Sequence, residues 1–272
     1  MKRLVVLVKH VPATEQVKMN PETGTMMRDG LQMTINPLDL YAVEEAVRIA
    51  ELRDERLRIT ALTMGPPAAE DAVREAMAIG CTDAVHLSSK AFGGSDTWAT
   101  AYALSQAVRH LGGFDLILCG ERATDGETGQ VGPMVGAMLD IPVLTYVSRI
   151  AIDDGSSRIV AHRAVEGGHE IVESPLPALV SVVKEINEPR LPTLGGKIAA
   201  RGAEIPVWSS DDVGAEEALV GLEGSPTRVV KVFYPTLARV GERVSADQYS
   251  AEECVDRLIR FLRETRILEE DI

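Results

Sequence analysis

The stretch 120–136 holds the residues whose types and spacing best suit chemistry, and it reads Gly-Glu-Arg-Ala-Thr-Asp-Gly-Glu-Thr-Gly-Gln-Val-Gly-Pro-Met-Val-Gly. An apolar run at 114–119 precedes it, and residues 133–139 continue it as a helix start. A strand, a polar turn and a helix in this order present unpaired backbone N–H groups and a partial positive charge, which together can hold a phosphate. Four glycines let the backbone approach a ligand closely: Gly126, Gly129, Gly132 and Gly136. The stretch therefore predicts a nucleotide-binding turn.

The elements that must position this turn alternate between strand and helix patterns over the first two thirds of the chain. Strands are expected at 4–8, 57–64, 84–87 and 116–119, and helices from Pro37 with Asn36 as N-cap, from about 68 to 79, and from the cap Asp96 to about 111. This alternation predicts an α/β fold, a Rossmann-like, doubly wound and mainly parallel sheet of the adenine-nucleotide-binding type. Ligands of such sheets lie beyond the carboxyl ends of the strands, which here are Lys9, Met64 and Gly120.

The pattern changes after residue 142. An added antiparallel hairpin region is expected from strands at 143–152, 158–165 and 169–173, with a hairpin turn at 153–156, and a buried strand follows at 178–183. Residues 188–197 contain two prolines and two glycines, so no regular structure is expected there. The end of the chain shows one good helix, at 251–266. We therefore expect a nucleotide-binding domain at 1–187, and a recognition loop with an extended C-terminal arm at 188–272.

Composition excludes several classes of function. The chain has 41 acidic and 28 basic residues, and the net charge of −13 argues against nucleic acid or an anionic membrane as the main partner. The three cysteines are far apart and the five histidines lack metal-ligand spacing, so neither a disulfide scaffold nor a metal site is expected. No segment approaches the ~20 apolar residues of a membrane span. The apolar run 4–8 is also shorter than the roughly seven residues of a secretion signal, so we expect a cytoplasmic protein.

Four motifs, in chain order, resemble the beta subunit of electron-transfer flavoproteins. The most specific is Ala-His-Arg-Ala-Val-Glu-Gly-Gly-His-Glu-Ile-Val at 161–172, followed by Pro-Ala-Leu-Val-Ser at 177–181. The others are Asn36-Pro37 with Ala-Val-Glu-Glu-Ala at 42–46, the turn at 120–132, and Asn-Glu-Pro-Arg-Leu-Pro-Thr-Leu at 187–194. Together they cover roughly residues 1 to 200, and four ordered motifs are far more specific than any one of them.

The resemblance implies a heterodimer of an alpha and a beta subunit. The alpha subunit holds an electron-carrying FAD, and the beta subunit binds either a second FAD or AMP as a structural filler. The pair accepts electrons from flavin dehydrogenases, such as acyl-CoA dehydrogenases, and passes them to another carrier. No nucleophilic catalytic residue is needed, and none is expected, because the flavin performs the electron chemistry and the protein tunes it.

One segment favours FAD over AMP. Residues 20–30 resemble an insertion typical of the members that carry a second FAD in the beta subunit and bifurcate electrons from NADH, and Val-Lys-His-Val-Pro at 8–12 fits the same group. Two positions, Ala13 and Asp39, depart from the acidic pattern of that group. Two alternatives remain. One is a subunit that binds only AMP. The other, more remote, is a free-standing ATP-binding hydrolase or sensor, against which stands the absence of a Ser-Gly-Gly-x-Asp-Ser loop after the first strand.

The resemblance also assigns the site residues. Phosphate contacts fall on Gly129, Gln130, Val131 and Gly132, and the adenine side falls on Leu7, Met64 and Gly65. Asn36 is an adenine or ribose contact as well as a helix cap, and Asp125 either caps the turn or binds a ribose hydroxyl. The remaining cofactor candidates are Lys9, Asp39, Gly120, Ala123 and Thr128.

Two further roles follow from the resemblance. Leu194 matches a partner-recognition loop in which an apolar side chain docks on the dehydrogenase, although a loop leucine can also tuck against its own surface. Arg163 and Glu166 are interpreted as an internal ion pair or as a pair at the subunit contact.

Overall fold

The computed structural model describes residues 3–13, 32–53, 57–152, 157–230, 243–245, 247–265 and 267–268. The 20–30 segment and the 153–156 turn therefore lie outside the described residues. Contacts divide the chain into two compact units, Met1–Lys231 and Val232–Ile272. The first unit extends beyond the boundary expected after residue 187, because β11 (Val207–Trp208) pairs with β5 (Asp83–Leu87) in the main sheet. Packing of the later residues on an alpha subunit stays a prediction.

A nine-stranded sheet forms the centre of the first unit, in the order β11-β5-β4-β1-β6-β10-β7-β8-β9. The seven strands from β11 to β7 run parallel, and only β8 and β9 are antiparallel. The remaining bounds are β1 (Arg3–Leu7), β4 (Arg58–Met64), β6 (Leu116–Gly120), β7 (Val143–Ile152), β8 (Arg158–Val165), β9 (Gly168–Pro175) and β10 (Ala178–Val182). A small separate pair joins β2 (His10–Pro12) to β3 (Met33–Ile35). The predicted α/β sheet with an added antiparallel hairpin is confirmed.

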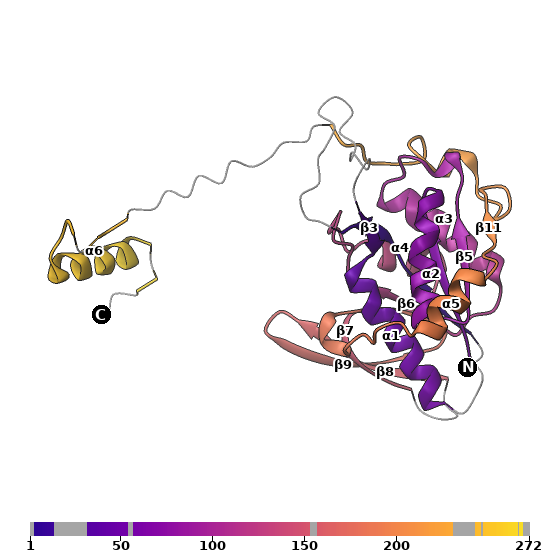
Figure 1. Ribbon diagram of the computed structural model, residues 1–272, viewed down its shortest axis with the longest axis horizontal. Coiled ribbons are helices and arrows are strands. Elements are labelled where there is room, and N and C mark those ends of the chain that lie inside the picture. The colour runs from indigo at the N-terminus through magenta and orange to yellow at the C-terminus, as the bar shows by residue number, and fades with distance from the viewer. Residues whose placement is uncertain are drawn as a thin grey trace. The chain divides into compact units, whose positions relative to one another are not determined.

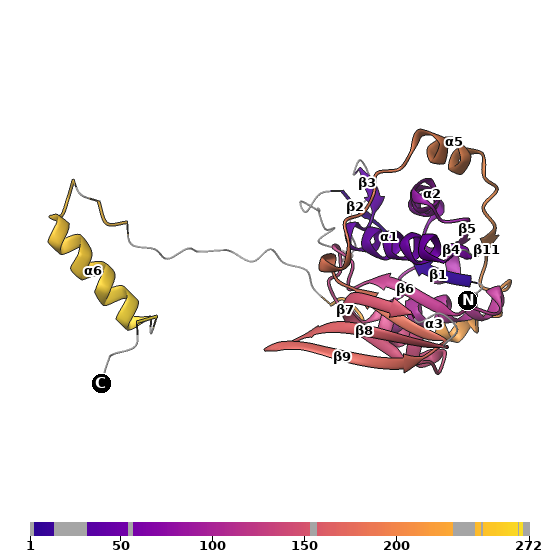
Figure 2. The same ribbon diagram turned by 90° about the horizontal axis from the view of Figure 1, so that it is seen from below.

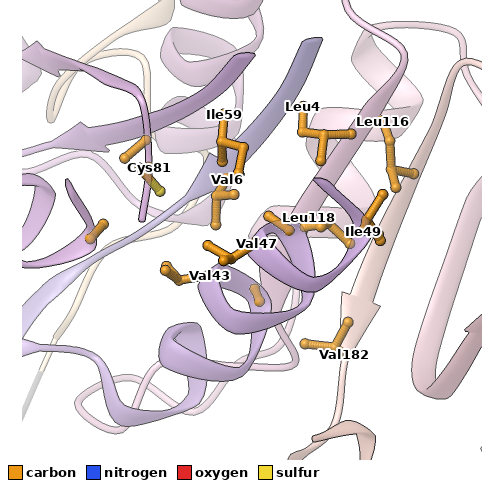
Figure 3. Packing of buried hydrophobic residues seen from close by; sticks show 14 of the residues in the cluster. Leu4, Val6, Val43, Val47, Ile49, Ile59, Cys81, Leu116, Leu118 and Val182 are labelled. Carbon is orange, nitrogen blue, oxygen red and sulfur yellow. The ribbon is translucent and has the colours of Figure 1, made fainter. Parts of the chain in front are cut away.

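Helices cover both faces of the parallel strands, as Figures 1 and 2 show. One face carries α1 (Pro37–Leu52) and α2 (Glu70–Ile79), and the other carries α3 (Thr97–Leu111) and α4 (Val131–Met138). Successive residues of β1 point to opposite faces, so Leu4 and Val6 join one hydrophobic core while Val5 and Leu7 join the other. Figure 3 shows the first core, where Val43, Val47 and Ile49 of α1 lie over the sheet. A strand buried on both faces explains why β1 reads as a continuous apolar run.

One expectation about regular structure is wrong. Residues 188–197 were expected to lack it, yet α5 (Leu194–Gly202) begins inside this range. Thr193 caps the helix, because its Oγ1 accepts from the N–H of Gly196 at 2.9 Å. A Cβ on Gly196 would lie 2.2 Å from the carbonyl oxygen of Ala78 on α2. This glycine therefore allows the two helices to pack closely, and it does not interrupt α5.

The expected internal ion pair between Arg163 and Glu166 is wrong, and a role for these two residues at the subunit contact stays a prediction. The Arg163 Nη1 lies 3.2 Å from Oε2 of Glu170, on the neighbouring strand β9. Its Nε donates to the carbonyl of Thr145, and its Nη2 donates to the Thr145 hydroxyl. Arg163 pairs with Glu170 in the β8·β9 register, whereas Glu166 sits in the turn between these strands. Cross-strand opposition, and not nearness in sequence, decides the pair.

The second unit contains α6 (Ala251–Glu264), close to the helix expected at 251–266. Its start forms a capping box, in which Ser250 Oγ accepts from the N–H of Glu253 and the Glu253 carboxylate accepts from the N–H of Ser250. Several apolar side chains of this unit are exposed: Val255, Leu258, Phe261 and Ile267.

Candidate functional site

A cavity of about 990 Å³ lies beyond the carboxyl ends of β1, β4, β5 and β6. After β1 the chain adds β4 and β5 on one side, and it then returns to place β6 on the other side of β1. The crossover connections therefore run in opposite directions from β1 and β6, which makes this pair the topological switch point of the sheet. Sheets of this kind have a ligand-binding crevice at the switch point. The sequence predicted this edge, and the structure confirms that its loops surround a cavity.

Asp39 joins the two strands that part at the crevice. Its carboxylate accepts from the N–H of Lys9, after β1, at 2.8 Å, and from the N–H of Gly120, at the end of β6, at 3.2 Å. Burial raises the pKa of Asp39 to about 7, against these hydrogen bonds and the nearby charge of Lys9. A Cβ on Gly120 would lie 2.6 Å from Oδ1 of Asp39, so this approach requires glycine. Asp39 thereby sets the spacing of the crevice.

Asn36 fixes the glycine-rich loop that follows β6. The side chain is fully buried, its Nδ2 donates to the carbonyl of Arg122 at 2.9 Å, and its Oδ1 accepts from the N–H of Thr124 at 3.2 Å. Asn36 is the N-cap residue of α1, as expected, but its side chain makes no cap bond to the helix. The reason is geometric, because both ends of the amide are committed to the loop. Contact between Asn36 and a nucleotide stays a prediction.

An ion pair closes the loop onto the end of β1. Lys9 Nζ lies 2.6 Å from Oδ1 of Asp125, and the Asp125 carboxylate is almost entirely buried. Lys9 lines the cavity, whereas Asp125 faces Lys9 from behind the lining. The 120–130 loop is thus fastened to two separate segments of chain, one through Asn36 and the other through Lys9.

The N-terminus of α4 opens into the cavity. Gln130, Val131 and Gly132 line it, and Gln130 makes no cap bond to the helix with its side chain, which instead accepts from Thr97 Oγ1 at 3.0 Å. The helix N–H groups at Val131 and Gly132 are therefore available to an anion, at the positive end of the helix dipole.

The glycines of the loop serve two different purposes. Gly129 has a φ of 62°, a conformation that favours glycine. Gly132 and Gly136 instead allow α4 to pack on the sheet, because a Cβ would lie 2.6 Å from Cys119 Sγ and 2.3 Å from Val143 Cγ2, respectively. A Cβ on Gly126 would meet nothing within 4 Å. Gly132 and Gly136 are therefore required for packing, and only Gly126 and Gly129 remain to allow the backbone to approach a ligand closely.

The structure brings together all of the predicted cofactor residues except Asn36 and Asp125, which brace the loop from behind. Those that line the cavity are Leu7, Lys9, Asp39, Met64, Gly65, Gly120, Ala123, Thr128, Gly129, Gln130, Val131 and Gly132. Their contact with a nucleotide stays a prediction.

One wall of the cavity was missed by the sequence reasoning. The 88–96 loop, between β5 and α3, lines the cavity with all of its residues except Ala91. The rule that drew attention to Lys9, Met64 and Gly120 also applies to the end of β5, and the run Ser-Ser-Lys-Ala-Phe-Gly-Gly-Ser-Asp could have been found with it. Behind the wall, the buried His86 holds Gly65, with Nε2 3.1 Å from its carbonyl oxygen. Burial lowers the pKa of His86, so the neutral ring donates.

Comparison with known proteins decides the family. The model of the electron transfer flavoprotein domain matches residues 23–213. This chain belongs to the electron transfer flavoprotein family. The beta-subunit resemblance is confirmed as well, because a beta subunit from Thermoanaerobacterium thermosaccharolyticum is 39% identical over 97% of this chain and 99% of its own length.

Other relatives of similar identity come from different systems. The caffeyl-CoA reductase-Etf complex subunit CarD of Acetobacterium woodii is 38% identical over 98% of this chain and all of its own length. Protein FixA of Azorhizobium caulinodans is 40% identical over 99% of this chain and 97% of its own. The similarity thus extends over the C-terminal unit as well as over the sheet.

The described parts of the chain contain neither a membrane-spanning helix nor a metal-binding cluster. None of the helices there combines the length and the apolar character that a membrane crossing requires. Among the same residues, no three His, Cys, Asp or Glu side chains gather closely enough to hold a metal ion.

Proposed function

We propose that this beta subunit binds FAD in the cavity beyond β1, β4, β5 and β6. The observation that carries the proposal is the α4 N-terminus, which points free N–H groups into a large cavity at the parting of β1 and β6. Its volume of about 990 Å³ is at the upper end of the ~300–1,000 Å³ typical of ligand pockets, which favours a dinucleotide over AMP.

The lining fits both ends of such a ligand. Apolar side chains of Leu7, Leu62 and Met64 form one wall and suit the flat adenine ring, and the N–H groups of Val131 and Gly132 suit the phosphates. Lys90 adds positive charge at the lining, whereas Arg122 forms an ion pair with Glu121, which also lines the cavity. Bound FAD would supply electron exchange with hydride carriers and one-electron acceptors, which no side chain of the described residues replaces.

We further propose that the subunit works in a heterodimer with an alpha subunit in the cytoplasm, and that it passes electrons between NADH or acyl-CoA dehydrogenase-type flavoenzymes and other carriers by electron bifurcation. The 20–30 insertion supports bifurcation, and so does the name of the CarD relative, which places that protein in a reductase–Etf complex. A subunit that binds AMP as a structural nucleotide is the second candidate, and it needs the same N–H groups at α4.

Counting nucleotides in the purified heterodimer tests the proposal. Acid extraction and chromatography should yield two FAD per dimer, one for each subunit, and no AMP. One FAD with one AMP would contradict the FAD assignment and leave the structural nucleotide. The absence of any adenine nucleotide from the beta subunit, even after incubation with excess AMP or FAD, would refute both.

Leu194 is proposed as the anchor for a dehydrogenase. Its side chain is 76% exposed at the start of α5. Just before it, Arg190 holds the chain to α1 through Glu44, with Nε–Oε2 at 2.8 Å and Nη2–Oε1 at 2.9 Å, and through Glu51. An exposed apolar side chain next to a segment that ion pairs hold in place suits transient recognition of a dehydrogenase. Leu194→Ala should raise the KM of a dehydrogenase for the heterodimer without changing its nucleotide content.

A further inference from the structure

The 88–96 loop, which forms one wall of the cavity, contains Gly93 and Gly94 and joins β5 to α3. A glycine-rich loop loses more conformational freedom on ordering than an ordinary loop does. If the loop became ordered only when a ligand bound, the lost conformational entropy would weaken the binding. A loop that is already ordered in the free protein therefore binds the ligand more tightly. What holds this loop in place therefore matters for the site.

A distant segment, 221–227, packs against the outer side of this loop. The N–H of Gly221 donates to Ser95 Oγ at 3.0 Å. A Cβ on Gly221, whose φ is 66°, would lie 2.3 Å from the carbonyl oxygen of Ala91, and a Cβ on Gly94 would lie 3.1 Å from Leu222 Cβ. No residue of the 221–227 segment lines the cavity itself. The segment thus supports the wall from outside.

Asp96 is the junction between the two. Its Oδ1 caps α3 by accepting from the N–H groups of Trp98 and Ala99, both at 3.0 Å. Its Oδ2 accepts from the N–H of Thr227 at 2.9 Å and from the Thr227 hydroxyl at 2.7 Å. The N–H of Asp96 donates to Ser225 Oγ at 2.8 Å.

The ionised form of Asp96 fits these partners. Burial opposes its ionisation, but the hydrogen bonds with Thr227, Ala99 and Trp98 outweigh burial and lower its pKa. All of these donors serve one carboxylate, and hydrogen bonds to a charged group are stronger than neutral ones. The junction is thus a built contact between segments about 130 positions apart, as the separation of 131 between Asp96 and Thr227 shows.

We propose that Asp96 is a positioning residue which couples the nucleotide cavity to the 221–227 segment, from which the chain runs on to the second compact unit. Through Thr227 and Ser225 the segment orders the cavity wall, and a ligand that fills the cavity in turn stabilises the segment. Binding free energies are reciprocal, so each effect requires the other. This inference rests on the proposed nucleotide site.

The test uses Thr227→Val, which removes the hydroxyl donor to Asp96 at nearly constant volume and outside the cavity lining. The full chain, purified with its alpha subunit and stripped of adenine nucleotide, is titrated with AMP and, separately, with FAD. Coupling predicts binding about fivefold weaker or more, the lower end of ordinary coupling between sites. Hydrogen exchange of residues 221–227 should slow on nucleotide addition in the wild type, and less so in the variant.

Thr193→Val is the matched control. Thr193, like Thr227, does not line the cavity, and its hydroxyl caps α5. This variant therefore loses a structural hydrogen bond outside the cavity lining. It should bind nucleotide as the wild type does. A second variant, Asp96→Asn, keeps an acceptor for the α3 cap but loses the charge that Thr227 contacts, and it should weaken binding as Thr227→Val does.

The outcomes separate the two hypotheses. If the wild type binds neither AMP nor FAD, the proposed function fails and this inference fails with it. If the wild type binds nucleotide and Thr227→Val binds equally well, with exchange of 221–227 unaffected by nucleotide, the coupling is refuted while the proposed function stands. Equal weakening in Thr193→Val would also refute it, because the effect would then be general destabilisation.

Discussion

At the scale of single residues, the site depends on buried polar groups that act on the backbone. Asn36 and Asp39 lie three positions apart at the start of α1. Asp39 bonds to the backbone at the last residue of β6, and Asn36 bonds to the backbone of the loop that follows β6. A buried polar group left without its partner costs more than the bond was worth, so these two positions should tolerate little change.

Replacing Asn36 by Ala should weaken nucleotide binding by roughly 5- to 100-fold, because the carbonyl of Arg122 and the N–H of Thr124 lose a partner worth about 1–3 kcal/mol. Titration of nucleotide onto the stripped heterodimer measures the effect. Asn187→Ala is the matched control, since the Asn187 amide bonds to Tyr41 and Glu45 away from the cavity. Equal binding by wild type and Asn36→Ala would show that the loop needs no such support.

Asp39 should make stability depend on pH. Its folded pKa of about 7 lies above the unfolded value near 3.9, so the folded state holds the proton more tightly. The stabilisation is complete below about pH 4 and is lost as the pH rises towards 7. Relative to Asp39→Asn, which does not titrate, the wild type should lose on the order of 3–4 kcal/mol over this range. Urea unfolding of nucleotide-free protein between pH 4.5 and 7.5 measures it, and a constant difference between the two proteins would contradict the burial argument.

At the scale of elements, the centre of the parallel sheet could be predicted from sequence because β1, β4, β5, β6 and β10 are buried along almost their whole length and read as mostly apolar runs. The bounds of β7 and β8 matched those expected, since alternating patterns there are bounded by turn residues. The two-residue strand β11 and the glycine-containing α5 could not be predicted, because tertiary pairing with β5 and packing on α2 stabilise them.

The site followed the same division. The local sequence pattern of strand, glycine-rich turn and helix predicted the turn after β6 and the start of α4 at the end of that turn. The partners of the Asn36 side chain lie 86 and 88 positions along the chain, and Asp96 has, besides its local helix cap, partners 129 and 131 positions along it, so no local pattern reports these long-range contacts. Sequence reasoning therefore found most of the lining of the cavity but not the contacts that hold the lining in place.

Packing of α4 on the sheet gives a prediction at this scale. Gly136→Ala should destabilise the protein by about 1–3 kcal/mol, because the added Cβ would lie 3.4 Å from Leu179, in the core, and 2.3 Å from Val143, which packs against that core. Gly126→Ala, on the same stretch but with open space around its Cβ, should change stability by less than about 0.5 kcal/mol. Thermal unfolding of the two variants compares them, and similar losses would mean that the glycines at 120–136 are not packing positions.

At the scale of the whole molecule, one sheet carries the cavity, and segments from distant parts of the chain support it. α1 supplies Asn36 and Asp39 at its start and holds Arg190 through Glu44, while the 221–227 segment supports the opposite wall. The cavity, the exposed Leu194 and the 221–227 segment are thus linked to one frame of buried strands. The similarity to CarD and FixA over almost the whole chain fits a common architecture that includes all three.

The central claim is that an adenine nucleotide binds with its phosphates at the N-terminus of α4. A crystal structure of the purified heterodimer with its native nucleotide tests this most directly. The account predicts phosphate oxygens within hydrogen-bond distance, about 2.7–3.2 Å, of the N–H groups of Val131 and Gly132, with adenine beside Met64 and Leu7. A nucleotide bound elsewhere on this subunit, with the α4 N-terminus in contact only with water, would contradict it.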